Sequence, residues 1–447
     1  MLEIEDLEFP PESVHLCDLP DEIILRIFAQ LSTSEILQSL ALVCKKFSRI
    51  CRDASVISHI YLKPNLDNSQ QLSITNAISR SRCLKSLTLK GRSDAEHLVS
   101  TACSFCPKLE TLQIIHCPKL SDDCLALLAE SELCASLKNL NLECTPISTH
   151  WGTSQIMKLP NLTSLNLFNS RLFDSEHLKA LAYSCEKLEH LNIEEVTHLS
   201  EDAMITLIQE RKDTLKTLYV DGESLSDQTF KHLFLCQNLQ ELGISFAEEM
   251  GENGIYAISQ LHQLRILKLK RAKKVKSDDF VTLFARKNLA SLHCLDLSEC
   301  VQVSDDVIKT LALECPKLDK VMLNWCWEIR DEGLEFLTRY ANEISHLFLV
   351  GVVLITDVFL RDLLENLPKL VHLDLQQCPN VTDRKLENLV LKSENYQLQI
   401  VNYYGEIIQP EVPENLVKAE VNSDSSDSSS LSSATEGADS SAPSEGN

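Results

Sequence analysis

Glycine is scarce in this sequence, and basic residues are outnumbered by acidic ones. Only 11 of the 447 residues are glycine, and they do not cluster as a phosphate-binding loop. The patterns G-x-x-x-x-G-K-S/T, G-x-G-x-x-G, H-E-x-x-H and G-x-S-x-G are absent, so the common nucleotide, zinc-protease and serine-hydrolase sites are not indicated. Lys and Arg total 42 against 65 Asp and Glu, a formal net charge of −23. So acidic a chain is a poor candidate for binding nucleic acid or an anionic membrane, because both repel it.

Long apolar runs are also missing. No stretch of 18 apolar residues occurs, so we predict no membrane span. The N-terminal segment MLEIEDLEFPPES is acidic and lacks the apolar core of a secretion signal. We therefore expect the 17 cysteines to be reduced thiols packed as small apolar side chains, in a cytoplasmic or nuclear protein.

Leucine recurs in the frame L-x-x-L-x-L along most of the chain, for example at Leu109, Leu112 and Ile114. Successive units begin 24 to 28 residues apart, a period that matches leucine-rich repeats. The first positions fall at Ile57, Leu84, Leu109, Leu137, Leu162, Leu188, Leu215, Leu239, Leu264, Leu292, Leu318, Ile344, Leu370 and Leu398.

Each unit has two halves with different periodicity. The alternation in L-x-L predicts a short strand buried on one face. A Ser/Thr-Asp step such as Ser121-Asp122 then provides a hydroxyl cap and a negative charge for a helix start, and leucines at helical spacing follow. Strands pack about 4.8 Å apart and helices about 8–10 Å apart, so the stack must bend. The sequence thus predicts an α/β fold, a leucine-rich-repeat horseshoe with parallel strands inside and helices outside.

Cysteine recurs at two places in the unit: the ninth position, as in Cys117 and Cys300, and three residues before the next unit, as in Cys106 and Cys185. This pattern resembles the cysteine-containing subclass of leucine-rich repeats over residues 57–402. Cys103 and Cys106, with His116 and Cys117 nearby, also have the spacing of zinc ligands. Because repeat position explains both pairs, we favour packed thiols and predict no metal and no cofactor.

The segment before the repeats contains short amphipathic helices that are too few to bury all their own apolar faces. It resembles the F-box over residues 18–60, which implies docking onto a small Skp-type adaptor, and through it to a cullin and a RING protein. The alternative is a helical cap that only shields the end of the solenoid. The matching residues are Leu19, Pro20, Glu22, Ile23, Ile27, Phe28, Leu31, Leu37, Val43, Cys44, Lys45, Phe47 and Asp53, and we expect the adaptor to contact them, Lys45 and Asp53 excepted.

Four regions follow from these patterns: an N-terminal segment (1–17), the F-box (18–56), about 13 repeats (57–405) and an acidic, serine-rich tail (406–447) that we expect to be disordered. The F-box resemblance implies a non-catalytic subunit of an SCF-type ubiquitin ligase that binds protein targets on the concave repeat face. The competing hypotheses are a repeat scaffold or inhibitor whose F-box does not dock, and an F-box protein that acts without degradation.

Positions three, five, seven and eight of each unit should face the concavity. Met322, Trp325 and Phe348 occupy such positions, and exposed apolar side chains in a concavity are typical interface anchors. We therefore predict that they bind the target. The alternative is that Trp325 or Trp327 packs between repeats. The histidines His190, His346 and His372 recur at the third position, where we interpret them as polar strand residues rather than catalytic bases.

The run from Lys268 to Lys276 holds six cations in nine residues. Lys268, Lys270 and Arg271 fall at concave positions and are candidate contacts for an acidic or phosphorylated target. Two alternatives remain: a nuclear-import signal, which the core position of Leu269 argues against, and a solvated patch balanced by neighbouring acids. The acids proposed for that balance are Glu194, Glu195, Glu241, Glu248 and Glu249.

Overall fold

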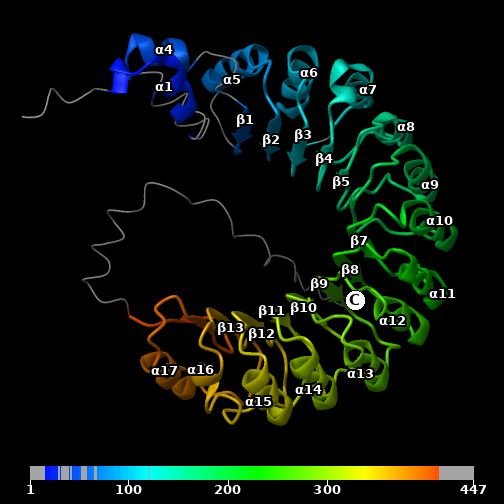
Figure 1. Ribbon diagram of the computed structural model, residues 1–447, viewed down its shortest axis with the longest axis vertical. Helices are drawn as coiled ribbons and strands as arrows, with labels where there is room; N and C mark the ends of the chain where they lie inside the picture. The colour runs from blue at the N-terminus through cyan, green and yellow to red at the C-terminus, as the bar shows by residue number, and fades with distance from the viewer. Residues whose placement is uncertain are drawn as a thin grey trace, which may run out of the picture.

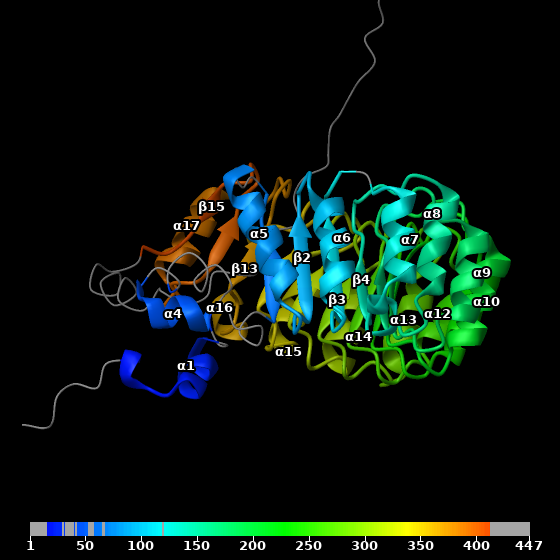
Figure 2. The ribbon, with the colours of Figure 1, turned by 90° about the horizontal axis from the view of Figure 1, so that it is seen from above.

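The structure is a computed structural model that describes residues 16–28, 31, 40, 43–51, 58–64, 68–118 and 120–411. Most of these residues form one curved array, with strands along its inner side and helices along its outer side (Figure 1). This is the α/β leucine-rich-repeat horseshoe predicted from the period. The helices α1 (Asp21–Phe28) and α4 (Lys45–Ile50) lie at its N-terminal end, outside the stack of repeats (Figure 2).

The strands of the described residues form a single sheet in chain order. All neighbouring pairs are parallel except the last, in which β15 runs antiparallel to β14. The strands are β1 (His59–Leu62), β2 (Ser86–Lys90), β3 (Thr111–Ile115), β4 (Asn139–Asn141), β5 (Ser164–Asn166), β6 (His190–Ile193), β7 (Thr217–Asp221), β8 (Glu241–Ser245), β9 (Ile266–Leu269), β10 (Cys294–Asp296), β11 (Lys320–Met322), β12 (His346–Phe348), β13 (His372–Asp374), β14 (Gln399–Val401) and β15 (Ile407–Ile408).

Helices cover the outer side, and their lengths vary from one turn to three. At two other Ser/Thr-Asp steps, Ser277-Asp278 and Thr356-Asp357, the hydroxyl residue is not the cap that the pattern predicts: α13 begins at Ser277 itself, and Thr356 is followed by turns rather than directly by a helix. The helices are α5 (Asn68–Arg80), α6 (Ala95–Phe105), α7 (Asp122–Glu130), α8 (His150–Gln155), α9 (Ser175–Ser184), α10 (Glu201–Arg211), α11 (Asp227–Phe230), α12 (Glu252–Ile258), α13 (Ser277–Ala285), α14 (Asp305–Glu314), α15 (Asp331–Tyr340), α16 (Leu363–Asn366) and α17 (Asp383–Leu391), with 3₁₀ turns at η1 (Leu16–Asp18), η3 (Glu132–Ala135), η4 (Ile156–Lys158) and η5 (Lys231–Leu235).

Strand pairing confirms the predicted repeat frame except at its end. The third residue of each unit lies opposite the third residue of the next unit. Ser86 lies opposite Thr111, for example, and His346 lies opposite His372. In the last unit Gln399 lies opposite His372, so the start predicted at Leu398 is one residue out of register. Strands β14 and β15 form an antiparallel hairpin at the end of the sheet. Because β15 lies beyond residue 405, this hairpin extends past the predicted end of the repeats. The rest of the tail, from residue 412, lies outside the described residues.

The recurring cysteines link neighbouring repeats through their thiols. Cys300 Sγ donates to the carbonyl oxygen of Leu269 at 3.1 Å, and Cys378 Sγ donates to that of Leu349 at 3.0 Å. Burial raises the pKa of Cys300 to about 12, so its thiol stays protonated and able to donate. Each of the 17 cysteines lies in a described segment, and all are free thiols. Their roles fit the expectation of packed, reduced cysteines.

A left-handed residue ends the strand segment of nearly every unit. Trp325 has φ 60° and Gly351 has φ 70°, and Pro64 and Gly222 are the exceptions among the eighth positions of the units from Ile57 to Leu370. The backbone N–H of the eighth residue donates to the next unit, as Trp325 N does to the carbonyl oxygen of Val350 at 2.7 Å. These hydrogen bonds offset the conformational free energy of about 1–2 kcal/mol by which the left-handed backbone is disfavoured for a residue other than glycine. The positions are Gly91, His116, Cys144, Asn169, Glu195, Phe246, Arg271, Glu299, Trp325, Gly351 and Gln377.

Two aspartates connect consecutive repeats on the outer side. The carboxylate of Asp331, the first residue of α15, accepts hydrogen bonds from the Thr356 backbone N–H at 2.8 Å and from its hydroxyl at 2.7 Å. Asp357, which lies in a turn, accepts the same pair from Thr382, at 2.8 and 2.7 Å. An aspartate at this place in the unit therefore fixes the start of the next repeat's outer segment, whether or not it begins a helix itself.

We expect Asp331→Ala to lower the free energy of unfolding by about 1–3 kcal/mol, because it leaves the Thr356 N–H without its acceptor. Asp383→Ala is the matched control. Asp383 also opens a helix, α17, but no further helix follows it among residues 16–411. Urea denaturation followed by circular dichroism measures both. Equal losses in the two variants would mean that the effect is on the helix dipole and not on the link between repeats.

Candidate protein-binding surfaces

The F-box has a small core of its own. Ile24 and Phe28 of α1 pack against Phe47 and Ile50 of α4, and all four side chains are buried. The Phe28 and Phe47 rings meet edge to face with centroids 5.1 Å apart. Phe28 and Phe47, which were predicted to contact an adaptor, face inward in the free chain and hold the two helices together, so a contact of theirs with an adaptor stays a prediction.

A second set of apolar F-box side chains faces outward. Ile23 is 41% exposed, Ile27 37%, Leu31 36% and Val43 61%. Ile23 and Ile27 are four residues apart and so share one side of α1. We call these four residues the F-box apolar face. Leu19 and Cys44 are half-buried, Pro20 and Glu22 are exposed, and Leu37 lies outside the described residues.

Polar contacts fix the Leu-Pro segment against α4. Lys46 Nζ donates to the carbonyl oxygens of Cys17 at 2.8 Å and Leu19 at 2.7 Å, and lies 3.5 Å from the Asp21 carboxylate. The Cys44 thiol caps α4 by accepting the Phe47 N–H at 3.3 Å, which lowers the pKa of Cys44. Sequence matching included Lys45 and missed Lys46, because only the packing of α4 on η1 shows which lysine turns inward.

The concave face carries an apolar and histidine-rich group near its C-terminal end. Phe348 lies opposite Met322, and its ring centroid is 4.9 Å from that of His372. Lys320 Nζ lies 5.1 Å from the Phe348 centroid, and the His346 and His372 rings stack at 6.2 Å. Burial lowers the pKa of both histidines, which keeps them neutral near pH 7. We call Lys320, Met322, His346, Phe348 and His372 the concave cluster.

Trp325 is placed differently from Met322 and Phe348. A Cβ atom at Gly351 would come within 2.3 Å of Trp325 Cε3, so the indole ring lies directly on the Gly351 backbone of the next repeat. Trp325 is half-buried there, as the alternative of packing between repeats predicts. Trp327, in contrast, is 51% exposed.

Most cations of the basic run have partners within the chain. Arg271 Nε lies 2.6 Å from Glu299 Oε2, Lys270 Nζ lies 3.7 Å from Asp296 Oδ2, and Lys273 Nζ lies 2.7 Å from Glu248 Oε1. Lys274 pairs with Glu249. These contacts favour the balanced-patch alternative. Of the acids proposed for it, Glu248 and Glu249 form ion pairs with the run, whereas Asp296 and Glu299 were not anticipated.

Lys268 differs from its neighbours. Its Nζ lies 5.1 Å from the Tyr219 ring centroid, and within the described ranges no carboxylate lies within ion-pair distance of it. Lys320 of the concave cluster likewise lies over an aromatic ring, that of Phe348, and forms no ion pair with a described carboxylate. Lys268 and Lys320 are therefore strand lysines whose charge no described carboxylate of the chain pairs with.

One group of side chains within the described segments could hold a metal ion: His150, Asp174 and His177, on the outer side of the solenoid. Sequence reasoning missed this group, because the three residues come from two repeats and match no spaced motif. No helix among residues 16–411, apart from the stretches left undescribed, is long and apolar enough to cross a membrane.

Comparison with known proteins identifies both parts of the chain. An F-box-like family model matches residues 16–63. The chain is 25% identical over 276 residues to the F-box protein SKIP17 of Arabidopsis thaliana, covering 50% of this chain and 53% of that protein. It is 24% identical over 241 residues to the F-box/LRR-repeat protein 4 of Bos taurus, covering 53% and 36%. The matches thus span about half and about a third of these relatives' own lengths.

A solved structure shares the fold. Rad7, in the crystal structure of the Rad7 and Elc1 complex in yeast, superposes with a TM-score of 0.52 at 18% identity, over 86% of this chain and 93% of that chain. The resemblance to F-box and leucine-rich-repeat proteins is confirmed by these findings. The cysteine-containing subclass stays a prediction.

Proposed function

We propose that this chain, which joins an F-box-like domain to a leucine-rich-repeat solenoid, is the substrate-recognition subunit of an SCF-type ubiquitin ligase. The F-box apolar face carries the proposal. The small F-box core buries one side of α1 and leaves Ile23, Ile27, Leu31 and Val43 at the surface, although side chains of this kind gain free energy by leaving water. A Skp-type adaptor would cover them and connect the chain to a cullin and a RING protein.

In this proposal the chain carries out no chemical step. It would hold a target on the concave face while the adaptor side positions the ubiquitin-conjugating enzyme. Holding the target and the conjugating enzyme on one rigid frame raises their effective concentration. In this proposal that is all the chain contributes to the reaction. The parallel sheet supplies that rigidity, because each strand is bonded to its neighbour along the array.

The decisive experiment is co-purification of the full chain with a Skp-type adaptor and a cullin. Because Rad7 is described in complex with Elc1, an Elc1-type adaptor should be offered beside the Skp-type one. We expect one-to-one binding of the Skp-type adaptor. Binding of neither adaptor would favour a plain repeat scaffold, and binding of the Elc1-type adaptor alone would replace the SCF assignment with a different ligase class.

The concave cluster is the proposed target contact, and Phe348→Ala tests it. We expect at least tenfold weaker target capture, because truncation of a central aromatic anchor typically costs 1–2 kcal/mol or more. Phe348 is half-buried on the open face, so the melting temperature should fall by only a few degrees. Targets captured by wild type and variant under proteasome inhibition are compared by quantitative mass spectrometry.

Leu391→Ala is the control for that comparison, because Leu391 is an 83% exposed apolar residue of α17 on the outer side. Its captured targets should match those of the wild type. A Phe348→Ala protein that captures the same targets in the same amounts would exclude the concave cluster as the target contact and leave the adaptor assignment untouched.

A further inference from the structure

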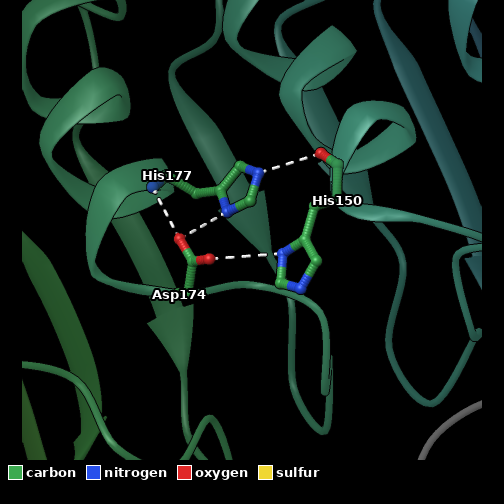
Figure 3. A group of neighbouring side chains, drawn as sticks. All are labelled: His150, Asp174 and His177. Carbon is green, nitrogen blue, oxygen red and sulfur yellow. Dashed lines mark hydrogen bonds and ion pairs between the residues drawn. The ribbon is translucent and has the colours of Figure 1, made fainter.

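Two histidines and an aspartate meet where two neighbouring outer helices begin (Figure 3). His150 is the first residue of α8, Asp174 is the N-cap of α9, and His177 lies in the first turn of α9. His177 Nδ1 is 2.6 Å from Asp174 Oδ1, and His150 Nδ1 is 3.2 Å from Asp174 Oδ2. The two imidazole rings are nearly parallel, with centroids 5.5 Å apart. The carboxylate thus has one imidazole nitrogen at each of its oxygens.

The contacts of His177 determine which of its nitrogens carries a proton. Its Nε2 lies 2.9 Å from the carbonyl oxygen of His150. A carbonyl only accepts, so Nε2 must donate, and a neutral ring then has a lone pair on Nδ1. That lone pair would point at a carboxylate oxygen 2.6 Å away, which is repulsive. Both contacts of the ring are favourable at once only if Nδ1 also carries a proton, or if a metal ion bound at Nδ1 takes the place of that proton.

We propose that a divalent transition-metal ion, zinc in the first instance, binds here through His150 Nδ1, His177 Nδ1 and Asp174 Oδ2. Two imidazole nitrogens and one carboxylate oxygen are ligands that zinc commonly takes in proteins. One possible ligand atom of each residue lies within 4.8 Å of those of the other two. Zinc bonds of about 2.0–2.2 Å bring ligand atoms closer together than that, so binding requires side-chain shifts on the order of 1 Å.

The surroundings of the three ligands match those of a built metal site. Donation of Nε2–H to a backbone carbonyl is the usual way in which a ligating histidine is oriented. Asp174 Oδ1 accepts the backbone N–H groups of Glu176 at 3.1 Å and His177 at 3.0 Å, which fixes the carboxylate and leaves Oδ2 for the metal. The side chain of His177 is 10% exposed, whereas those of Asp174 and His150 are 46% and 60% exposed, so the site is open to solvent at these two ligands. Water or a partner's side chain can complete the coordination there.

The site would connect two repeats at a weak step of the solenoid. His150 belongs to the unit that starts at Leu137, and the other two ligands belong to the unit that starts at Leu162. Helix α8 has six residues and passes directly into the 3₁₀ turn η4, so few helical hydrogen bonds hold it. In units such as the one that holds Asp331, an aspartate at the start of the helix accepts hydrogen bonds from the next repeat. Here His150 stands at that place, and Asp174 and His177 of the next repeat contact it. A bound metal would strengthen this link between the two repeats.

The test is equilibrium dialysis of the reduced full-length chain against zinc, with bound metal counted per chain. Free thiols also bind zinc, so the comparison of variants carries the result. We expect the wild type to hold one more zinc than His150→Ala, with affinity for that zinc lowered by at least about a hundredfold in the variant. Asp174→Asn keeps an acceptor for the N-cap and should lose the same zinc. His262→Ala removes an exposed histidine elsewhere and should bind as the wild type does.

Thermal melting provides a second measurement. Zinc should raise the melting temperature of the wild type and of His262→Ala, and should leave that of His150→Ala unchanged, because a ligand that binds only the folded state stabilises it. Equal zinc content and equal melting shifts in the wild type and His150→Ala would overturn the proposal. The cluster would then be an imidazolium–carboxylate pair.

Discussion

Replacing Ile23 and Ile27 together with aspartate should abolish adaptor binding while the chain stays folded. Each side chain is about two-fifths exposed in the free chain and so tolerates a polar replacement there. Covered by an adaptor, each would contribute up to about 1.5–3 kcal/mol. An unpaired carboxylate in that interface costs several kcal/mol more, so the combined loss exceeds a factor of 10³ in affinity.

The control for this pair is Leu313→Asp, because Leu313 is an exposed apolar residue of the outer helix α14, away from the F-box. Pull-down of adaptor and cullin compares the three proteins, and circular dichroism confirms that each is folded. Phe28→Ala should also lose the adaptor, but through loss of the F-box core. If the double aspartate variant retains adaptor and cullin at wild-type levels, the F-box apolar face is not the docking surface.

Gly351→Ala should destabilise the solenoid by about 2–4 kcal/mol. The added Cβ would lie 2.3–2.6 Å from three atoms of the Trp325 ring, so the indole must move or the two repeats must separate. The left-handed backbone at Gly351 adds a further cost of about 1 kcal/mol. Chemical denaturation of the full chain measures the loss.

Two further variants separate these causes. Gly405→Ala is also at a left-handed glycine, φ 87°, but its Cβ would meet Gln376 at an ordinary 3.4 Å, so it should lose about 1 kcal/mol only. In the double variant Gly351→Ala with Trp325→Ala the clash disappears, and the two losses should be strongly non-additive. Additive losses would show that the Trp325 ring does not pack on Gly351.

The repeat frame could be predicted from sequence because leucine spacing and strand pairing obey the same period. Every first position from Leu84 to Leu370 agrees with the observed pairing, since a one-residue slip would turn each leucine toward water. The register of the last unit was mispredicted at Leu398. There the strand β14 pairs with β15 in a hairpin and not with the strand of a following repeat, so the repeat period does not determine its register.

Side-chain roles were harder to predict than backbone positions. Ile27 and Phe28 are adjacent in a short helix, and only the position of α4 decides that one is exposed and the other buried. The sequence favoured Trp325 as an anchor because its position faces inward, yet a glycine in the next repeat provides a flat surface on which the ring lies. Likewise, the partners of Arg271 and Lys270 lie 26 or more residues further along the chain, and no local pattern connects them.

The antiparallel strand β15 has a consequence for how this protein behaves at high concentration. In a stack of parallel strands, the exposed edge of the last strand presents the same hydrogen-bonding groups that every earlier strand offered to its successor, so a second molecule could continue the array. Here β15 occupies the edge of β14 in the opposite direction and is only two residues long. It therefore ends the array with a strand too short, and in the wrong direction, to serve as a template. A chain cut before Ile407 would keep its horseshoe but expose β14, and we expect it to assemble end to end into filaments or aggregates.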